Sequence, residues 1–327
     1  MKKLIYIIIL FFLFSGCSDF LEEEPKTILT PGGFYTTEQG MESLVQACYS
    51  FARYQASNGS LNFINLNANG TDIGQNGGNN LTFDGYQLKS SAGQLRGLWN
   101  NNYEAINACN NVTEFIDVVE GMSDELKTIR EAEARFLRAY YYYPLVMHFG
   151  PVHLTLEATE GVETEANRTP VDQIFDVMLE DLEFAVANLP GTQPTYGRVD
   201  AYAAKHFLSR VILSDDRSTT EDFNRAAQLA VDVINNSGHE LEPTRAVVFD
   251  ENNEKNNEIV WSVQFPEDES LAGNNGNWMH LHYISRYELG VPGIIRSLEY
   301  GRPWIVNRPT PFLLDLYDAT VDSRYSA

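Results

Sequence analysis

Apolar positions recur at helical spacing through the first two thirds of the chain. Between residues 38 and 54, Met41, Leu44, Val45 and Cys48 fall three or four positions apart, which predicts a helix with one buried stripe. The same periodicity predicts further helices over residues 94–118, 123–147, 170–188, 200–214 and 221–236. The pattern therefore predicts a mostly α-helical protein.

The ends and contact faces of these helices add detail. Thr169 is expected to cap the helix over 170–188, with Pro170 in its first turn and Asp172 completing a capping box. Alanines cluster in the next two helices, where small side chains allow close approach, and Gly238 is expected to end the second of them. Paired helices of this kind resemble tetratricopeptide units.

Two regions break the helical pattern. Residues 55–93 are rich in Asn and Gly, which disfavours a helix, and a loop of this length is often functional. After residue 239, short strands are predicted over 247–249 and 259–263, and a last short helix over 310–317. We therefore expect a helical scaffold over residues 35–238 and an irregular, loop-rich second lobe over 239–327.

The first residues have the layout of a lipoprotein signal peptide. Lys2 and Lys3 precede an apolar run over residues 4–14, which is too short to span a bilayer, and small residues lead into Cys17. We expect removal of residues 1–16, lipidation of Cys17 and an extended acidic tether over residues 17–34. The alternative is an ordinary secretory signal followed by a chance cysteine.

Charge and cysteine content limit the classes of function. The chain has 45 acidic and 23 basic residues, with a net charge of −22. Nucleic-acid binding is therefore not expected, since neutralising phosphates requires clustered Lys and Arg. Cys48 and Cys109 lie within helical patterns. We expect them to be two buried thiols, with a disulfide between them as the alternative.

Several segments, in order along the chain, resemble the RagB/SusD family of outer-membrane nutrient-binding lipoproteins. The resemblance rests on the start of the mature chain at Cys17, the Leu98–Trp99 helix, the run from Glu131 to Tyr142, and Phe149–Gly150–Pro151–Val152. A later segment beginning at Arg308–Pro309–Thr310 also resembles the family. The likeness covers almost the whole chain.

This resemblance implies a fold, a place and a partner. The fold would be a tetratricopeptide-like scaffold carrying an irregular lobe, on a lipoprotein held to the outer membrane and facing the exterior. The partner would be a TonB-dependent transporter of the SusC type, to which the protein delivers a captured glycan or peptide. Family members continue beyond the last similar segment, so the resemblance also implies a C-terminally truncated chain.

Aromatic residues in predicted loops are the candidate glycan contacts, because rigid amphipathic rings stack on sugars. The polar neighbours Asn69, Asp72 and Asn80 are candidates to form hydrogen bonds with sugar hydroxyl groups. The candidate ligand-binding residues are Asp72, Tyr86, Trp278, Tyr283 and Trp304. By contrast, Trp99, Tyr140 and Tyr141 occur at helical spacing and are expected in the core.

The sequence gives little reason to expect catalysis or a cofactor. Acidic pairs such as Asp215–Asp216 arise by chance among so many acids, and no catalytic or phosphate-binding motif appears. His280 and His282 lack an evident third metal ligand. We therefore expect a binding protein, with a structural or adhesive surface subunit as the first alternative and a carbohydrate-cleaving enzyme as the second.

Overall fold

The protein is helical over most of the length that the structure describes. The computed structural model describes residues 31–56, 62–77, 81–159, 161, 165–265, 277, 279–296, 301–303, 307–318 and 320–322. Cys17 and the rest of the predicted signal and tether through residue 30 lie outside these ranges. Within the described ranges, no helix combines the length and apolar character needed to cross a bilayer.

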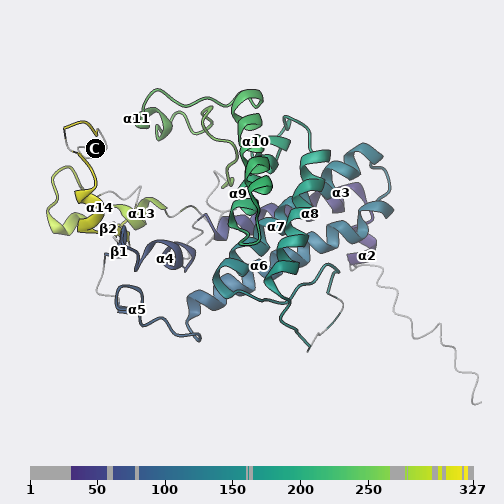
Figure 1. Ribbon diagram of the computed structural model, residues 1–327, viewed down its shortest axis with the longest axis horizontal. Coiled ribbons are helices and arrows are strands. Elements are labelled where there is room, and N and C mark those ends of the chain that lie inside the picture. The colour runs from purple at the N-terminus through teal and green to yellow at the C-terminus, as the bar shows by residue number, and fades with distance from the viewer. Residues whose placement is uncertain are drawn as a thin grey trace, which may run out of the picture.

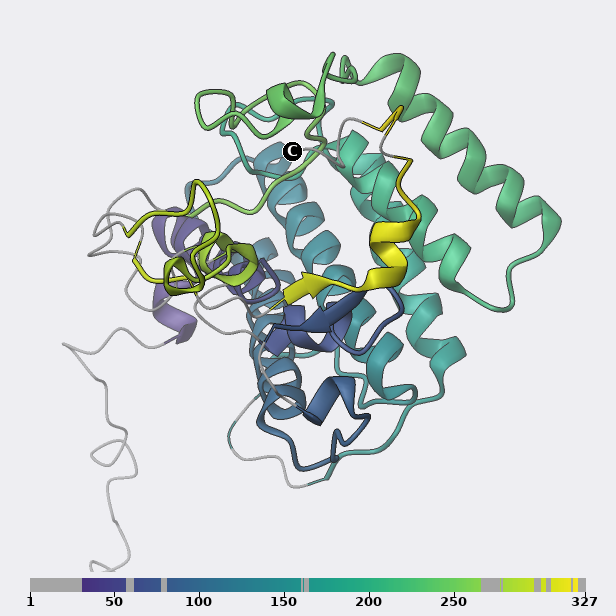
Figure 2. The ribbon, with the colours of Figure 1, turned by 90° about the vertical axis from the view of Figure 1, so that its left-hand side faces the viewer.

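All the long helices predicted from periodicity are confirmed. They are α3 (Glu38–Phe51), α6 (Gly93–Phe115), α7 (Asp124–Phe149), α8 (Val171–Asn188), α9 (Ala201–Ser214) and α10 (Thr220–Asn236). From α6 to α10 each helix packs against the next, and α3 lies against α6 and α7 (Figures 1 and 2). This arrangement is the predicted tetratricopeptide-like scaffold.

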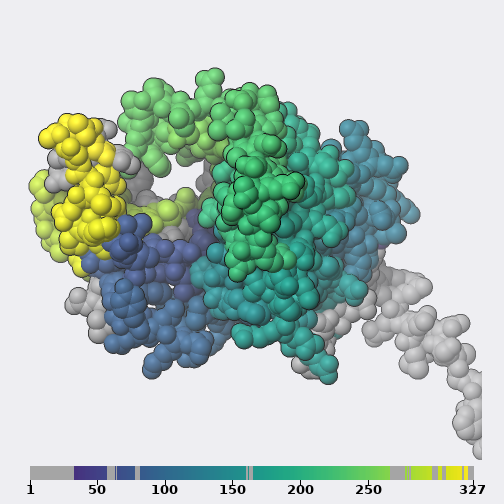
Figure 3. All heavy atoms as spheres, viewed as in Figure 1, coloured from purple at the N-terminus to yellow at the C-terminus, as the bar shows by residue number. Residues whose placement is uncertain are grey.

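Shorter elements surround the long helices. They are α2 (Pro31–Phe34), η2 (Ala52–Tyr54), α4 (Asn62–Ala68), β1 (Gly74–Asn76), α5 (Leu81–Asp84), η3 (Ile116–Val118), α11 (Arg245–Val248), α13 (Met279–Tyr283), η5 (Tyr287–Leu289), β2 (Asn307–Pro309) and α14 (Pro311–Asp315). β1 and β2 pair antiparallel although they lie far apart in the sequence, with Asn76 opposite Asn307 (Figure 2). Figure 3 shows an opening between these C-terminal elements, the segment around α11 and the helical scaffold.

Helix ends follow local capping chemistry at several positions, although not at every predicted one. The Asp200 carboxylate accepts hydrogen bonds from the backbone N–H groups of Tyr202 and Ala203, which starts α9. The predicted cap at Thr169 is wrong. Pro170 occupies the N-cap of α8, while the Thr169 hydroxyl accepts a hydrogen bond from the Leu154 amide across the bridge between Val152 and Thr169.

Predictions in the Asn-rich region and after residue 239 need correction. Residues 55–93 contain the helices α4 and α5, because tertiary contacts override weak propensity: α4 packs on α6, and Phe83 of α5 is buried. The expected strand over 247–249 is wrong, since Thr244 caps the short helix α11 there. Residues 259–263 form no strand either, because Val260, Trp261 and Val263 pack on helices rather than on a sheet.

A buried charge cluster joins three helices of the scaffold. The Arg138 guanidinium on α7 donates to both Asp181 carboxylate oxygens on α8, at 2.8 and 2.7 Å. It also donates to Oδ1 of Asn110 on α6 at 3.0 Å. The Asn110 amide in turn donates to the carbonyl oxygens of Thr155 and Glu157 in the following loop. Burial raises the pKa of Asp181 although Arg138 acts to lower it.

A second charge cluster ties α3 and α7 to the loop before α9. The Glu133 carboxylate is fully buried and lies 2.7 Å from the guanidinium of Arg198 and 3.4 Å from that of Arg130. Both arginines also contact Glu42 on α3. Burial raises the pKa of Glu133 to about 7, against the lowering effect of the two arginines.

The prediction of two buried thiols is confirmed, and no disulfide joins them. Cys48 and Cys109 are both free and fully buried, on α3 and α6. Burial raises the pKa of Cys48, and its hydrogen bond with Cys109 raises it further. Both side chains therefore act as small core residues.

Removing one partner of the Arg138–Asp181 pair should strongly destabilise the scaffold. We expect Asp181→Ala to lower the free energy of unfolding by about 3–5 kcal/mol, because it leaves a buried guanidinium without its counter-charge. Urea denaturation measures the change, with the exposed Asp172→Ala on the same helix as the control. A loss no larger than that of the control would contradict this role.

The raised pKa of Glu133 predicts a pH-dependent stability. Between pH 4.5 and about 7 the folded protein keeps a proton on Glu133 that the unfolded chain releases. The Glu133 contribution to stability should therefore fall as pH rises across this window, by up to about 1.4 kcal/mol per pH unit. Urea denaturation across this pH window should show this fall in the parent and not in Glu133→Gln. The Glu42 pKa is lowered, so Glu42 titrates below the window.

Equal pH slopes for the parent and Glu133→Gln would show that Glu133 does not titrate between these values. The same result would remove the link between burial of this carboxyl and stability.

Candidate functional site

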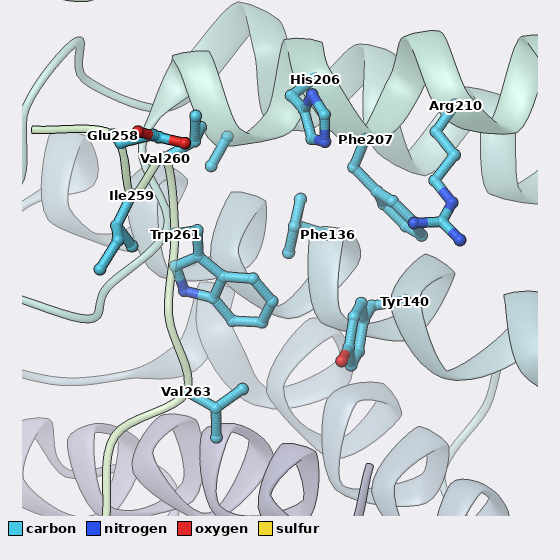
Figure 4. A pocket seen from close by; sticks show the side chains of 11 residues that line it. Phe136, Tyr140, His206, Phe207, Arg210, Glu258, Ile259, Val260, Trp261 and Val263 are labelled. Atoms are coloured by element: carbon cyan, nitrogen blue, oxygen red, sulfur yellow. The ribbon is translucent and has the colours of Figure 1, made fainter. Parts of the chain in front are cut away.

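A groove lies between α7, α9 and the extended segment 258–263, and its volume is about 530 Å³ (Figure 4). The side chains around it are mostly aromatic or aliphatic at the floor and polar at the rim. They belong to Phe136, Tyr140, Ala203, His206, Phe207, Arg210, Glu258, Ile259, Val260, Trp261 and Val263. A space of this size is in the range of small-molecule sites.

Aromatic rings that brace one another form the floor of the groove. The Trp261 ring meets the rings of Phe136 and Tyr140 edge-on, with centroids 5.5 and 5.3 Å apart. Phe207 of α9 lies 5.8 Å from Tyr140 and 5.6 Å from Phe136. These edge-to-face contacts restrain the rings, so the floor is a preformed apolar surface.

Hydrogen bonds to the scaffold hold the segment that carries Trp261. The Trp261 Nε1–H donates to the carbonyl oxygen of Gly197 at 2.9 Å. The Arg53 Nε–H donates to the carbonyl oxygen of Gln264 at 2.8 Å. Gly197 has φ +89°, and a Cβ atom there would lie 2.3 Å from Cγ of Gln264. Glycine is therefore required at this close approach.

The rim of the groove carries cationic and hydrogen-bonding groups. His206 and Arg210 lie one turn apart on α9 and are both exposed (Figure 4). Arg210 has its guanidinium 5.5 Å from the ring centroid of Tyr143. Partial burial lowers the pKa of His206, and the Arg210 charge lowers it further, so the imidazole is neutral at pH 7. On the other side, the Glu258 carboxylate accepts a hydrogen bond from the Glu242 amide.

The Tyr140 hydroxyl is available to a ligand. Within the described ranges it makes no hydrogen bond, unlike the neighbouring hydroxyls of Tyr141 and Tyr143, which bond Cys48 and Ser214. Burial raises the pKa of Tyr140 to about 12, so this group stays a neutral donor and acceptor.

Two further hollows share walls with this groove. One, of about 360 Å³, shares Tyr140, Phe207 and Arg210 and extends toward α4. The other, of about 310 Å³, shares Trp261 and Val263 and extends past Arg53. The three hollows therefore adjoin one another through these shared residues.

The ligand-binding residues predicted from the sequence lie elsewhere in the described part of the chain. Asp72 precedes β1 and is exposed; its carbonyl oxygen accepts a hydrogen bond from the Thr310 hydroxyl. Tyr86 follows α5, has φ +53° and is 83% exposed. Tyr283 ends α13 and is 50% exposed. Trp278 and Trp304 lie outside the described residues.

The fold brings the neighbourhoods of these predicted residues together without joining their side chains. α5 contacts β1, and α13 contacts β2, so Asp72, Tyr86 and Tyr283 belong to elements around the small sheet. No hydrogen bond or ring contact links the three among the described residues. Of the predicted polar neighbours, Asn69 is buried and donates to Oδ1 of Asn65, while Asn80 lies outside the described residues.

Several residues of the groove were not predicted as functional. Trp261 was placed in a predicted strand, and Tyr140 was expected in the core because its spacing is helical. Tyr140 does pack against the core, but it also faces the groove. Tyr141 is fully buried as expected, whereas Trp99 is 36% exposed beside Tyr103 and Phe149, which corrects the expectation that it lies in the core.

Comparison with known proteins identifies the family. A sequence model of SusD-like proteins, described as starch-binding and associating with the outer membrane, matches residues 19–213. The chain belongs to the SusD-like family.

Relatives of this SusD-like chain include curated and structurally characterised proteins. SusD-like protein P2 of Formosa agariphila is 27% identical over 332 residues, covering 98% of this chain and 63% of the relative. SusD-like protein P25 of the same organism is 26% identical over 303 residues, covering 84% of this chain and 56% of the relative. The chain thus spans somewhat more than half the length of these relatives.

Solved structures share this SusD-like fold. A crystal structure with a xylogluco-oligosaccharide is 26% identical, with a TM-score of 0.62, and the match covers 75% of this chain and 49% of that one. A SusD superfamily protein from Parabacteroides distasonis has a TM-score of 0.73 at 20% identity, with coverage of 88% and 61%. The second likeness concerns the fold alone.

Gly197 should be required for the wall of the groove. We expect Gly197→Ala to lower the free energy of unfolding by about 1–2 kcal/mol, because its φ is positive and its Cβ would displace Gln264. Urea denaturation measures this, with Gly191→Ala as a control that makes only an ordinary contact with Tyr202. Equal stability of the two variants would show that the contact between Gly197 and Gln264 does not require glycine.

Proposed function

We propose that this SusD-like protein binds an oligosaccharide in the groove between α7, α9 and residues 258–263. The observation that carries the proposal is the aromatic floor beneath a polar rim, on a scaffold whose family is described as starch-binding. The related structure with a xylogluco-oligosaccharide gives further support.

The chemistry of the groove suits a sugar chain. Sugar rings have apolar faces that pack on aromatic side chains, and Trp261 and Tyr140 offer such area at low entropic cost. Their hydroxyl groups need hydrogen-bond partners, which the Tyr140 hydroxyl, His206 and Arg210 supply at the rim. The adjoining hollows lengthen the surface for additional sugar units.

The proposal includes a place and a partner. We propose that lipid on Cys17 holds the protein to the outer membrane, facing the exterior, and that it delivers its ligand to a TonB-dependent transporter of the SusC type. The signal-peptide layout before Cys17 supports the anchor. The family description as associating with the outer membrane supports the location.

The exposed residues around the small sheet are a second candidate contact. Asp72, Tyr86 and Tyr283 stay predictions as ligand-binding residues, since exposed tyrosines and a carboxylate also suit sugars or a peptide. We propose a binding role rather than an enzymatic one. Steady release of reducing ends from a polysaccharide by the purified protein would contradict a purely binding role.

Substitution of one hydroxyl group tests the groove. Tyr140→Phe keeps the ring and its packing but removes the hydroxyl, so we expect oligosaccharide affinity to fall by roughly three- to tenfold. Calorimetric titration of the lipid-free chain with a panel of oligosaccharides measures this. Tyr202→Phe on α9, outside the groove, is the matched control and should keep the parental affinity.

Tyr283→Phe distinguishes the two candidate contacts. If this substitution weakens binding and Tyr140→Phe does not, the ligand binds beside the small sheet of β1 and β2 rather than in the groove. If no member of the panel binds to folded protein, the glycan-binding proposal is wrong, and the structural role at the transporter becomes the better account.

A further inference from the structure

The charges that line the groove and its adjoining hollows are the reverse of those on the whole chain. The protein carries 45 acidic and 23 basic residues. The charged side chains lining the three hollows are Arg53, Arg198, Arg210 and one acid, Glu258, with His148 and His206 beside them. A cationic lining on a strongly anionic protein is a local feature that needs its own explanation.

Among the described residues, neither Arg210 nor Arg53 has a carboxylate partner, and of these two arginines Arg210 is the one that lines the main groove. Arg198 lies within ion-pair distance of Glu42 and Glu133, and the Arg53 Nε–H donates to the carbonyl oxygen of Gln264. Among the described residues the Arg210 guanidinium forms no hydrogen bond and no ion pair, and it lies over the ring of Tyr143. A guanidinium has five N–H donors in a planar fork, so most of the Arg210 donors remain available.

Arg210 is also aimed at the ligand space. It borders both the main groove and the hollow toward α4, so a ligand that fills either space passes its side chain. Glu258, the acidic lining residue, lies at the opposite end of the groove (Figure 4). Glu258 forms no ion pair with Arg210 in the described part of the chain, and its carboxylate accepts a hydrogen bond from the Glu242 amide.

We infer that the groove selects an acidic oligosaccharide, with Arg210 binding a carboxylate or sulfate group of a sugar that stacks on the Trp261 and Tyr140 rings. This inference rests on the proposed glycan-binding function and specifies its ligand class. The planar fork of Arg210 suits bidentate contact with either group. The neutral His206 imidazole, one turn away on α9, offers a further N–H donor.

The negative charge of the whole protein opposes the binding of an anionic ligand. A net charge of −22 repels an anionic ligand at long range, most strongly at low ionic strength. An acidic glycan therefore requires a specific short-range partner, and a neutral glycan does not. An unpaired arginine above aromatic rings provides both the charge-assisted bond and the stacking surface in one place.

Matched acidic and neutral ligands test the inference. The lipid-free full chain is titrated calorimetrically with a short oligogalacturonate, its methyl ester, a sulfated galacto-oligosaccharide and the unsulfated form. We expect an acidic form to bind roughly ten- to hundredfold more tightly than its neutral counterpart. Arg210→Gln should abolish that preference. The control Arg225→Gln on α10, which breaks an exposed pair with Glu183 of α8, should keep it.

The possible results distinguish selection of an acidic ligand from glycan binding in general. Preference for the carboxylate alone or the sulfate alone identifies which anion Arg210 reads and supports the inference. Equal binding of acidic and neutral ligands, unchanged in Arg210→Gln, overturns the acidic ligand class and leaves glycan binding intact. Binding of no sugar of either kind by folded protein overturns both.

Discussion

The buried pair between Arg138 and Asp181 is the contact on which the rest of the scaffold depends. It joins α7 to α8, and through Asn110 it joins both to α6 and to the loop after α7. Two opposite charges removed from water tolerate little displacement, because every lost hydrogen bond leaves a buried charge uncompensated. The pair therefore restricts how α7 rotates and slides against its neighbours. Glu133 and its two arginines restrict the same helix toward α3.

The orientation of α7 in turn creates the groove. Phe136 and Tyr140 lie two residues on either side of Arg138, so they project from the opposite side of the helix. When Arg138 faces α8, these two rings face α9 and the segment that carries Trp261. This segment is held by two hydrogen bonds rather than by a sheet. The Trp261 side chain donates to the Gly197 carbonyl oxygen, and the Arg53 side chain donates to the Gln264 carbonyl oxygen. The polar interior and the aromatic surface are thus two sides of one helix.

Sequence reasoning recovered the scaffold because helical periodicity is a local property. The stripes of α3 and α6–α10 depend on residues three and four apart, and cap residues such as Asp200 act within one turn. The groove depends on contacts between residues far apart in the sequence, so local periodicity could not predict it. Trp261 lies in an apolar run that resembles a strand, and Tyr140 lies on a helical stripe. Only the approach of residues 258–263 to α7 and α9 shows that their rings share one space. The sequence likewise could not predict that Arg210 has no carboxylate partner among the described residues, because this depends on where the neighbouring acidic side chains lie in the fold.

A crystal structure of the protein with a bound oligosaccharide would show directly whether the groove holds the ligand, without relying on substitutions. We expect sugar rings against Trp261 and Tyr140, with ligand oxygen atoms within hydrogen-bonding distance of the Tyr140 hydroxyl and the Arg210 guanidinium. A ligand bound at Tyr86 and Tyr283, with the groove between α7 and α9 empty, would contradict this expectation.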